Sequence, residues 1–303
     1  MPDHILSVDQ FDRHFIESIF RSADVCAELE EPICKRGKKK MTALFYEPSS
    51  RTRFSFESAA LSLGIEMMSS EAAGQFSSAA KGETLEDTIR VIHSYADLIV
   101  LRHPEVGAAV RAASVSHVPI INAGDGVGEH PTQALLDLYT IKKELGRVDD
   151  LIVTLVGDLK NGRTVHSLLK LLMLHAPYMV RLVSPPELRA PFELVERMTR
   201  MGIAVTESAD MVEALGRADV VYMTRIQKER MSTPTAYETL KGSYCFLPEH
   251  LEMISDNGIV MHPLPRVGEI DPRCDDSLKA AYFRQAANGV PIRMALLKHL
   301  LRL

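Results

Sequence analysis

Short apolar runs alternate with amphipathic stretches along most of this chain, and this alternation constrains the fold more than any other feature. The runs predicted to be strands are Met41–Tyr46, Ile65–Ser69, Leu98–Leu101, Val118–Ile121, Leu151–Val156, Val180–Ser184, Val220–Met223 and Ile259–His262. Helical patterns lie between them, such as Thr84–Ala96, with apolar residues at helical spacing, and Pro131–Leu145, which starts with a proline suited to the first helical position. Alternation of this kind predicts parallel sheets with helices on both faces. We therefore predict an α/β fold with two doubly wound domains, each with a central parallel sheet flanked by helices.

The bulk composition excludes several classes of partner. The 303 residues carry a formal net charge of -5, so no global charge attracts nucleic acid or an anionic membrane. The longest apolar runs, such as Leu168–Leu174, are far too short to span a bilayer, and the first residues lack the pattern of a signal peptide. The four cysteines form no CxxC pair, which argues against a zinc site and suits a reducing compartment. We expect a cytoplasmic protein with no nucleic-acid partner and no membrane partner.

Polar or turn-forming clusters follow six of the predicted strands, at the point where each strand ends. The clusters are Glu47–Arg53, Arg102–Pro104, Asn122–Gln133, Gly157–Arg163, Thr224–Arg230 and Pro263–Arg266. In doubly wound sheets, ligands gather at the carboxyl ends of the strands. The agreement among six strand ends therefore favours a ligand site there. The charged stretch Lys142–Asp150 separates the first three clusters from the last three and is the predicted domain boundary.

The first cluster, Glu47–Arg53, has the composition of an anion site. The predicted strand ends, the chain turns, and a helix is expected to begin near Arg51. Backbone N–H groups at a helix start are unpaired and bind phosphate well. Three hydroxyl groups and two arginines within five residues exceed what a helix cap needs, and they add donors and permanent charge. We therefore prefer an oxyanion cradle to a Ser/Thr-rich cap with a surface arginine.

The segment SSRTRFSFE, residues 49–57, resembles the carbamoyl-phosphate loop of the transcarbamoylases, usually written S-T-R-T-R, and Ser50 keeps the hydroxyl of the family's threonine. Other family signatures follow in the same order: KGET at 81–84, RHP at 102–104, HPTQ at 130–133, GDLKNGRTVHS at 157–167, MTRIQKER at 223–230 and HPLPR at 262–266. The resemblance spans nearly the whole chain. HPLPR, the arginine of the MTR segment and the lack of an SMG loop are similar to the aspartate enzymes of this family rather than to the ornithine enzymes.

The resemblance implies transfer of a carbamoyl group from carbamoyl phosphate to the amine of L-aspartate, which is the first committed step of pyrimidine biosynthesis. A neutral amine attacks the carbamoyl carbon and phosphate leaves, so we expect no metal and no cofactor. Negative charge grows on the carbonyl oxygen and then on the phosphate, so catalysis should depend on positioning and electrostatic stabilisation. L-aspartate has two carboxylates, which the two guanidinium groups of Arg163 and Arg225 would match.

The resemblance also implies roles for individual residues. Those implied to bind carbamoyl phosphate are Ser49, Ser50, Arg51, Thr52, Ser77, Lys81, Arg102, His130, Gln133 and Leu264. Those implied to bind L-aspartate are Lys81, Arg163, Arg225, Gln227, Leu264 and Pro265. The residues given a catalytic role are Arg51, Thr52, Lys81, Arg102 and His130. A cis bond before Pro265 would suit a tight functional turn, although the residues alone favour trans.

A domain division and an assembly are implied as well. Residues 1–147 would form the carbamoyl-phosphate-binding domain and residues 148–286 the aspartate-binding domain, while a C-terminal helix, about 287–303, would pack back onto the first. Three chains would form a closed homotrimer with shared active sites, because in this family the loop that carries Ser77 and Lys81 reaches into the neighbouring subunit's site. The sequence leaves open whether regulatory chains or another enzyme of pyrimidine synthesis bind this trimer.

Two other classes of protein are weaker alternatives. A dinucleotide-dependent oxidoreductase would share the sheet pattern, and Gly124–Gly128 superficially resembles a glycine fingerprint. That segment lacks the GxGxxG spacing, and Gly157–Gly162 lacks the GK[ST] ending of a P-loop. A non-catalytic homologue that only binds an anionic metabolite is disfavoured because all the polar groups that the reaction needs are present.

Overall fold

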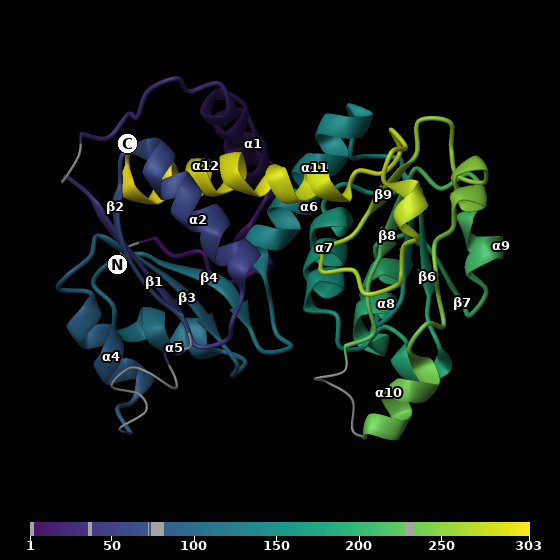
Figure 1. Cartoon of the computed structure of the whole chain (residues 1–303), viewed down its shortest axis with the longest axis horizontal. Helices are drawn as coiled ribbons and strands as arrows, with labels where there is room; N and C mark the ends of the chain where they lie inside the picture. The colour runs from purple at the N-terminus through teal and green to yellow at the C-terminus, as the bar shows by residue number, and fades with distance from the viewer. Residues whose placement is uncertain (1–2, 36–37, 72, 74–81, 228–232) are drawn as a thin grey trace. The chain divides into compact units, whose positions relative to one another are not determined.

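The structure is a computed structural model, and it describes residues 3–35, 38–71, 73, 82–227 and 233–303. The chain divides into two compact units, of which the first comprises Met1–Leu136 and Asn288–Leu303 and the second comprises Asp137–Ala287 (Figure 1). Each unit contains its own parallel sheet. The predicted fold class, two doubly wound α/β domains, is therefore confirmed.

In the first unit the described strands form a four-stranded parallel sheet in the order β2-β1-β3-β4. The strands are β1 (Lys40–Phe45), β2 (Glu66–Glu71), β3 (Leu98–His103) and β4 (Ile120–Asp125). The helices are η1 (Val8–Gln10), α1 (Arg13–Ala27), α2 (Ser50–Leu63), α4 (Leu85–Ile92), α5 (Ala108–Val115) and α12 (Gly289–Leu301), and α6 (Pro131–Leu145) begins in this unit. Helices α4 and α5 lie on one side of the sheet, and α1, α2 and α12 lie on the other (Figure 1).

Burial on both faces explains why the central strands β1 and β3 are mostly apolar. β1 is buried except at Lys40, and β3 is buried except at Arg102. On one face, Ile99 of β3 packs with Leu85 and Ile89 of α4. The other helices also pack together, since α12 contacts both α1 and α2. Full burial of one such aliphatic side chain stabilises the fold by about 1.5–3 kcal/mol.

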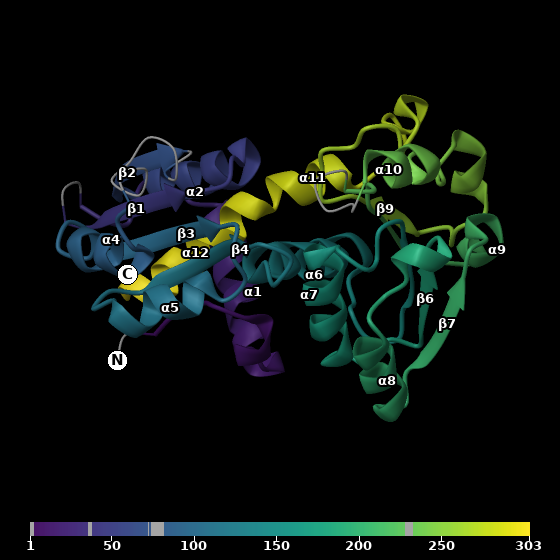
Figure 2. The ribbon, with the colours of Figure 1, turned by 90° about the horizontal axis from the view of Figure 1, so that it is seen from below.

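In the second unit the described strands form a five-stranded parallel sheet in the order β7-β6-β5-β8-β9. The strands are β5 (Ile152–Val156), β6 (Met179–Val183), β7 (Ala204–Ser208), β8 (Val220–Met223) and β9 (Ile259–Met261). The helices are α7 (Arg163–Met173), η3 (Pro186–Leu188), α8 (Phe192–Arg200), α9 (Met211–Leu215), α10 (Pro234–Leu240), η5 (Pro248–Glu252), η6 (Pro272–Cys274) and α11 (Tyr282–Ala287). Figure 2 shows β6 and β7 side by side, with α9 near β7.

One strand, β7, has no counterpart among the predicted strands. It pairs only with β6 at the edge of the sheet, and none of its residues Ala204–Ser208 is buried. An edge strand exposed on both faces needs no apolar run, so its sequence carries no strong hydrophobic pattern. Each of the eight predicted strands overlaps an observed strand.

The predicted helix over Thr84–Ala96 begins where expected but ends early. Thr84 is the N-cap of α4, and its side chain accepts a hydrogen bond from the N–H of Asp87 at 3.1 Å. The helix ends at Ile92, and a turn leads to Asp97, whose carboxylate accepts from the N–H of Lys40 at 2.9 Å. That bond fixes the start of β3 beside the start of β1, which leaves no room for another helical turn.

Candidate active site

Both sheets have a point where the strand order reverses, and several of the predicted ligand residues follow the strands on either side of it. In the first unit the chain passes from β1 to β2 on one side and then to β3 on the other, so the carboxyl ends of β1 and β3 are neighbours. In the second unit the same reversal separates β5 from β8. Ligands of doubly wound folds bind at such switch points, in the crevice outside the carboxyl ends of the strands. Each unit therefore carries one candidate half-site.

The first half-site begins at the turn between β1 and α2. Ser49 is the N-cap residue of α2, but its hydroxyl makes no capping hydrogen bond, so the first N–H groups of the helix are not satisfied by that side chain. Thr52 is buried within the first turn of α2, while Ser50 and Arg51 are exposed at the helix start. Hydroxyl groups, helix N–H groups and a guanidinium thus share one short segment, which can bind an oxyanion.

The other arginine of this turn, Arg53, has a structural environment. Its guanidinium lies 3.7 Å from a carboxylate oxygen of Glu57 and 3.3 Å from one of Glu71. It also stacks over the ring of Phe54, with 4.9 Å to the ring centroid. Arg53 therefore ties α2 to β2, and Arg51 is the better candidate for the anion.

Arg102 at the end of β3 connects three strand ends of the first unit. Its Nη1 donates to the carbonyl of Ala123 at 3.2 Å, and its Nη2 lies 3.7 Å from a carboxylate oxygen of Glu47. The backbone carbonyl of Arg102 accepts from the N–H of Tyr46 at 2.8 Å. Only 12% of the Arg102 side chain is exposed. The guanidinium is therefore held beside the β1–α2 turn, with its charge partly desolvated and its direction fixed.

His130 directly precedes α6, and contacts of its backbone carbonyl and its ring fix its orientation. Its carbonyl accepts from the N–H groups of Gln133 and Ala134, and its Nδ1 lies 3.5 Å from the hydroxyl of Thr132. The side chain is buried. Before it, the carboxylate of Asp125 accepts from the N–H of Glu129 at 2.7 Å and thereby closes the turn that leads to His130.

Asp125 organises the turn before His130, a role that the sequence analysis did not assign to it. Besides Glu129, its carboxylate accepts from the N–H of Gly107 at 2.8 Å and from the amide of Asn122 at 3.2 Å. The glycine-rich stretch Gly124–Gly128 is thus a tight turn organised by one buried carboxylate. It follows β4 rather than the first strand of the sheet, which removes the basis for a dinucleotide fingerprint. An aspartate at the end of a buried strand, followed by two glycines, was the available signal.

The second half-site is formed by the segments after β5 and β8. The carboxylate of Asp158, which is fully buried, accepts from the N–H of Asn161 at 2.9 Å. The carbonyl of Asn161 accepts from the N–H of Arg163 at 3.0 Å and from the side-chain amide of Gln227 at 3.1 Å. One carbonyl therefore joins the segment of Arg163, at the start of α7, to the segment that carries Arg225 and Gln227. All three of those side chains are half-buried.

The close approach of these two segments depends on Gly157. Its φ is +124°, and a Cβ there would lie 2.3 Å from the carbonyl oxygen of Thr224. We expect Gly157→Ala to destabilise the protein by roughly 3 kcal/mol or more, because strain and a backbone clash add up. Gly202→Ala is the matched control, since Gly202 has a φ of +80° but nothing within 4 Å of its Cβ position, and it should cost only about 1–2 kcal/mol. Equal losses for the two variants in urea unfolding would contradict the clash.

The loop after β9 supplies the last predicted residues. The Leu264–Pro265 bond is cis, and Leu264 has a φ of +55°. The N–H of Leu264 donates to Nδ1 of His262 at 2.8 Å. Burial lowers the pKa of His262, which suits a neutral ring that accepts a hydrogen bond at Nδ1. The loop geometry thus depends on this buried histidine, for which the sequence offered only the HPLPR motif.

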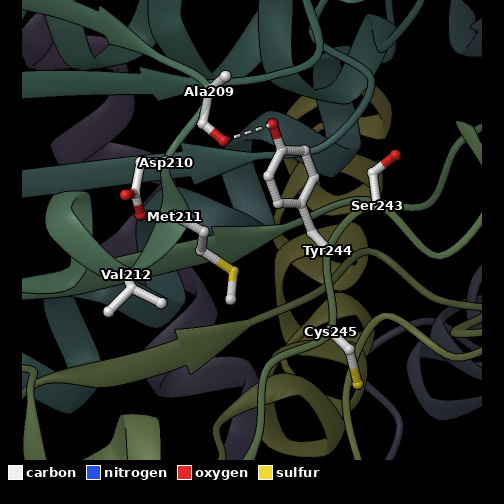
Figure 3. Close-up of a pocket in the computed structure, with 7 residues that line it drawn as sticks. All are labelled: Ala209, Asp210, Met211, Val212, Ser243, Tyr244 and Cys245. Carbon is white, nitrogen blue, oxygen red and sulfur yellow. Dashed lines mark hydrogen bonds between the residues drawn. The ribbon is translucent and has the colours of Figure 1, made fainter.

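A separate hollow of about 520 Å³ lies at the edge strand of the second sheet (Figure 3). Its lining is Ala209, Asp210, Met211, Val212, Ser243, Tyr244 and Cys245. The hydroxyl of Tyr244 donates to the carbonyl of Ala209 at 3.1 Å across it. The lining contains a carboxylate and no cationic side chain, so it does not suit an anionic substrate.

The predicted residues fall into three groups. Those of the first unit's half-site are Ser49, Ser50, Arg51, Thr52, Arg102, His130 and Gln133. Those of the second unit are Arg163, Arg225, Gln227, Leu264 and Pro265. Ser77 and Lys81 lie outside the described residues. Among the described residues no group of three or more His, Cys, Asp or Glu side chains could hold a metal ion, and no helix has the length and apolar character to cross a bilayer.

Two family models match this chain, one for each half. Residues 3–143 match "Aspartate/ornithine carbamoyltransferase, carbamoyl-P binding domain", and residues 149–300 match "Aspartate/ornithine carbamoyltransferase, Asp/Orn binding domain". The chain belongs to the aspartate/ornithine carbamoyltransferase family.

Relatives and solved structures agree along the whole chain. The chain is 49% identical to the aspartate carbamoyltransferase catalytic subunit of Methanocella arvoryzae, over 97% of this chain and 96% of that protein. It is 48% identical to the chloroplastic aspartate carbamoyltransferase 1 of Pisum sativum, over 99% of this chain and 78% of that protein. The catalytic subunit of M. jannaschii aspartate transcarbamoylase superposes with a TM-score of 0.90 at 46% identity, covering 99% and 98% of the two chains. The Trypanosoma cruzi enzyme in complex with carbamoyl phosphate and aspartate gives 0.92 at 40% identity, covering 98% and 96%.

Proposed function

We propose that this chain is an aspartate carbamoyltransferase, which transfers the carbamoyl group of carbamoyl phosphate to L-aspartate and yields N-carbamoyl-L-aspartate and phosphate. The observation that carries the choice of acceptor is the Asn161 carbonyl, which joins the segments of Arg163 and Arg225. Two guanidinium groups held at one switch point match the two carboxylates of L-aspartate. An ornithine site would instead have to receive a side-chain cation, which these two charges would repel.

The first half-site supports the binding and activation of carbamoyl phosphate. Ser49, Ser50, Arg51, Thr52 and the N–H groups of α2 would bind the phosphate, whose charge grows as the C–O bond breaks. Donors would also have to meet the carbonyl oxygen, which becomes an oxyanion when the amine attacks. The donors proposed for that oxygen are Thr52, Arg102 and His130, all buried or nearly so.

The acceptor is held by the second set of ligands. Arg163, Arg225 and Gln227 would bind the carboxylates of L-aspartate, and the carbonyl of Leu264 would accept from its amine. Gln133 would hold the carbamoyl amide group. As the new C–N bond forms, the amine loses one proton and the leaving phosphate gains one, so the reaction balances without a cofactor.

The domain assignment follows the substrates. We propose residues 1–147 as the carbamoyl-phosphate-binding domain and residues 148–286 as the aspartate-binding domain, with the helix near 287–303 belonging to the first. The two family matches, at 3–143 and 149–300, support the change of domain near residue 147. The contact of α12 with α1 and α2 supports the return of the C-terminus to the first unit.

A homotrimer is the proposed assembly. On α2, Phe54 is 56% and Leu61 is 63% exposed, and residues seven apart lie on the same face of a helix. Met68 of β2 adds a third exposed apolar side chain in this unit. Apolar side chains on one helix face favour association with another chain. Ser77 and Lys81 would complete the neighbouring active site. The sequence left open whether regulatory chains or another enzyme of the pathway bind this trimer, and a relative named as a catalytic subunit favours regulatory chains.

The reaction is proposed to take place in the cytoplasm as the first committed step of pyrimidine biosynthesis. All four cysteines are free thiols in the structure, and three of them are buried. Free thiols suit a reducing compartment, which supports this location.

An acceptor panel tests the proposed function. Purified protein dialysed against EDTA is incubated with carbamoyl phosphate and one amine, either L-aspartate, L-glutamate or L-ornithine. We expect N-carbamoyl-L-aspartate and equimolar phosphate from L-aspartate alone, since two carboxylates at the right spacing are required. A preparation of the nearly inactive Arg51→Ala variant, purified in parallel, controls for contaminating host enzyme. Preference for L-ornithine, or loss of activity after EDTA dialysis, would refute the proposal.

A further inference from the structure

A buried hydrogen-bond chain in the second unit ends at the loop proposed to contact the substrate amine. It starts at Asp137 on α6, which is fully buried. One oxygen of this carboxylate accepts from the hydroxyl of Tyr222 on β8 at 2.7 Å. The other oxygen accepts from the side-chain amide of Gln285 on α11, also at 2.7 Å. The carboxylate therefore joins α6, β8 and α11 inside the core of the unit.

The carboxylate determines which way the amide of Gln285 points. A carboxylate can only accept, so the NH2 group of Gln285 must face Asp137, and Oε1 must face the other way. There Oε1 accepts from the backbone N–H of His262 at 2.8 Å. His262 in turn accepts at Nδ1 from the N–H of Leu264 at 2.8 Å. The acceptor-only carboxylate fixes the Gln285 amide, and the two backbone N–H groups, which can only donate, fix the directions of the remaining bonds.

The hydrogen-bond chain ends at Leu264, whose backbone conformation has to be stabilised. Leu264 has a φ of +55°, in the left-handed region that a leucine rarely adopts. Such a conformation persists only when the surroundings impose it. Here the hydrogen bond from the N–H of Leu264 to the buried ring of His262 imposes it, and His262 is held by Gln285.

We propose that Asp137 and Gln285 are positioning residues of the carbamoyl-transfer reaction, acting through His262 to aim the carbonyl of Leu264 at the incoming amine. This inference rests on the proposed function, since it assumes the role of Leu264. Asp137 and Gln285 both lie outside the motifs that carry the family resemblance, although Asp137 follows Gln133 by four residues on α6.

Gln285→Met tests this hydrogen-bond chain, because methionine has a volume similar to that of glutamine but lacks its amide donor and its carbonyl acceptor. We expect kcat to fall by about 10–100-fold and the KM for L-aspartate to rise, while the KM for carbamoyl phosphate stays within about 3-fold, because only the geometry around the amine is lost. Thr154→Val is the matched control. It removes a buried 2.9 Å hydrogen bond from Thr154 on β5 to the carbonyl of Ala214 on α9, with no link to Leu264, so kcat should be unchanged.

An exchange of the two groups supplies a rescue. Gln285→Glu alone sets two carboxylates against each other and should be as impaired as Gln285→Met. Asp137→Asn alone should be impaired to a smaller degree, because the asparagine can still accept from Gln285 but then no longer accepts from the hydroxyl of Tyr222. In the double variant Asp137→Asn, Gln285→Glu, the asparagine can donate to the new carboxylate, which can still accept from the N–H of His262. We expect kcat to recover at least 10-fold relative to Gln285→Glu.

Hydrogen–deuterium exchange gives a readout that needs no activity. The amides of His262 and Leu264 should exchange faster in Gln285→Met than in the wild type or in Thr154→Val. Unchanged exchange, a folded Gln285→Met with wild-type kcat, or a double variant no better than Gln285→Glu would overturn the inference. A wild-type protein that fails to carbamoylate L-aspartate would refute the proposed function instead, and the exchange measurement would still decide whether the chain holds Leu264.

Discussion

Arg51→Ala is expected to lower kcat/KM for carbamoyl phosphate by about 10²–10³-fold, with a much smaller change in the KM for L-aspartate. Arg51 is exposed at the first turn of α2, where its guanidinium and the helix N–H groups would share the phosphate. Because charge develops on that phosphate as it leaves, the contact strengthens in the transition state. Initial-rate kinetics with each substrate varied in turn measures the effect.

Arg225→Ala is the reciprocal half of this prediction. Loss of one charge-assisted contact costs about 1.5–3 kcal/mol, so the KM for L-aspartate should rise by about 10–150-fold while that for carbamoyl phosphate changes little. Arg53→Ala is the control for Arg51→Ala, since Arg53 lies two residues after Arg51 but forms ion pairs with Glu57 and Glu71. It should lower stability more than activity. An Arg225→Ala protein impaired chiefly in carbamoyl phosphate use would contradict the division of substrates between the two units.

Mixed trimers of Lys81→Ala and Arg51→Ala chains should regain activity that neither parent has. If each active site takes Arg51 from one chain and Lys81 from its neighbour, every mixed trimer contains one interface with both residues intact. Random reassembly of equal amounts should then restore about one quarter of the wild-type activity, because about three quarters of the trimers are mixed and one site in three is native. The two variants are denatured, mixed, refolded and assayed beside unmixed parents.

The fraction of mixed trimers has to be measured before the recovered activity can be interpreted. A charge tag on one parent separates the mixed trimers by ion exchange, so that activity can be compared with the fraction of hybrids. Well-folded hybrids as inactive as their parents would show that Lys81 acts within its own chain or has no part in the reaction. Refolded mixtures of either variant with wild-type chains control for losses during reassembly.

Much of the fold follows from local patterns. A strand buried on both faces must be apolar, and a turn that binds an anion must carry donors, so both kinds of segment are visible without any knowledge of the partners. This is why β1, β3, β5 and β8 were found from the residues alone, while the anion-binding role of the turn at Ser49–Thr52 stays a prediction. The edge strand β7 escaped because no burial constrains its residues.

The connections between distant segments could not be found in the same way. Gln285 is 148 residues from Asp137, and Gln227 is 66 residues from the carbonyl of Asn161. No sequence pattern predicts the hydrogen-bond partner of a glutamine or an aspartate, because either residue could equally well lie on the surface. The strand order decides which strand ends become neighbours, and only that arrangement brings a hydrogen-bond donor within reach of its acceptor. The sequence by itself thus determined the layers of the fold, and it predicted which kinds of side chain bind the substrates. The tertiary structure decided that Arg102 reaches Ala123 and that Asp125 closes the turn before His130. It also decided that Leu264 is held through His262, because each of these contacts depends on backbone groups that only the folded sheets bring within reach.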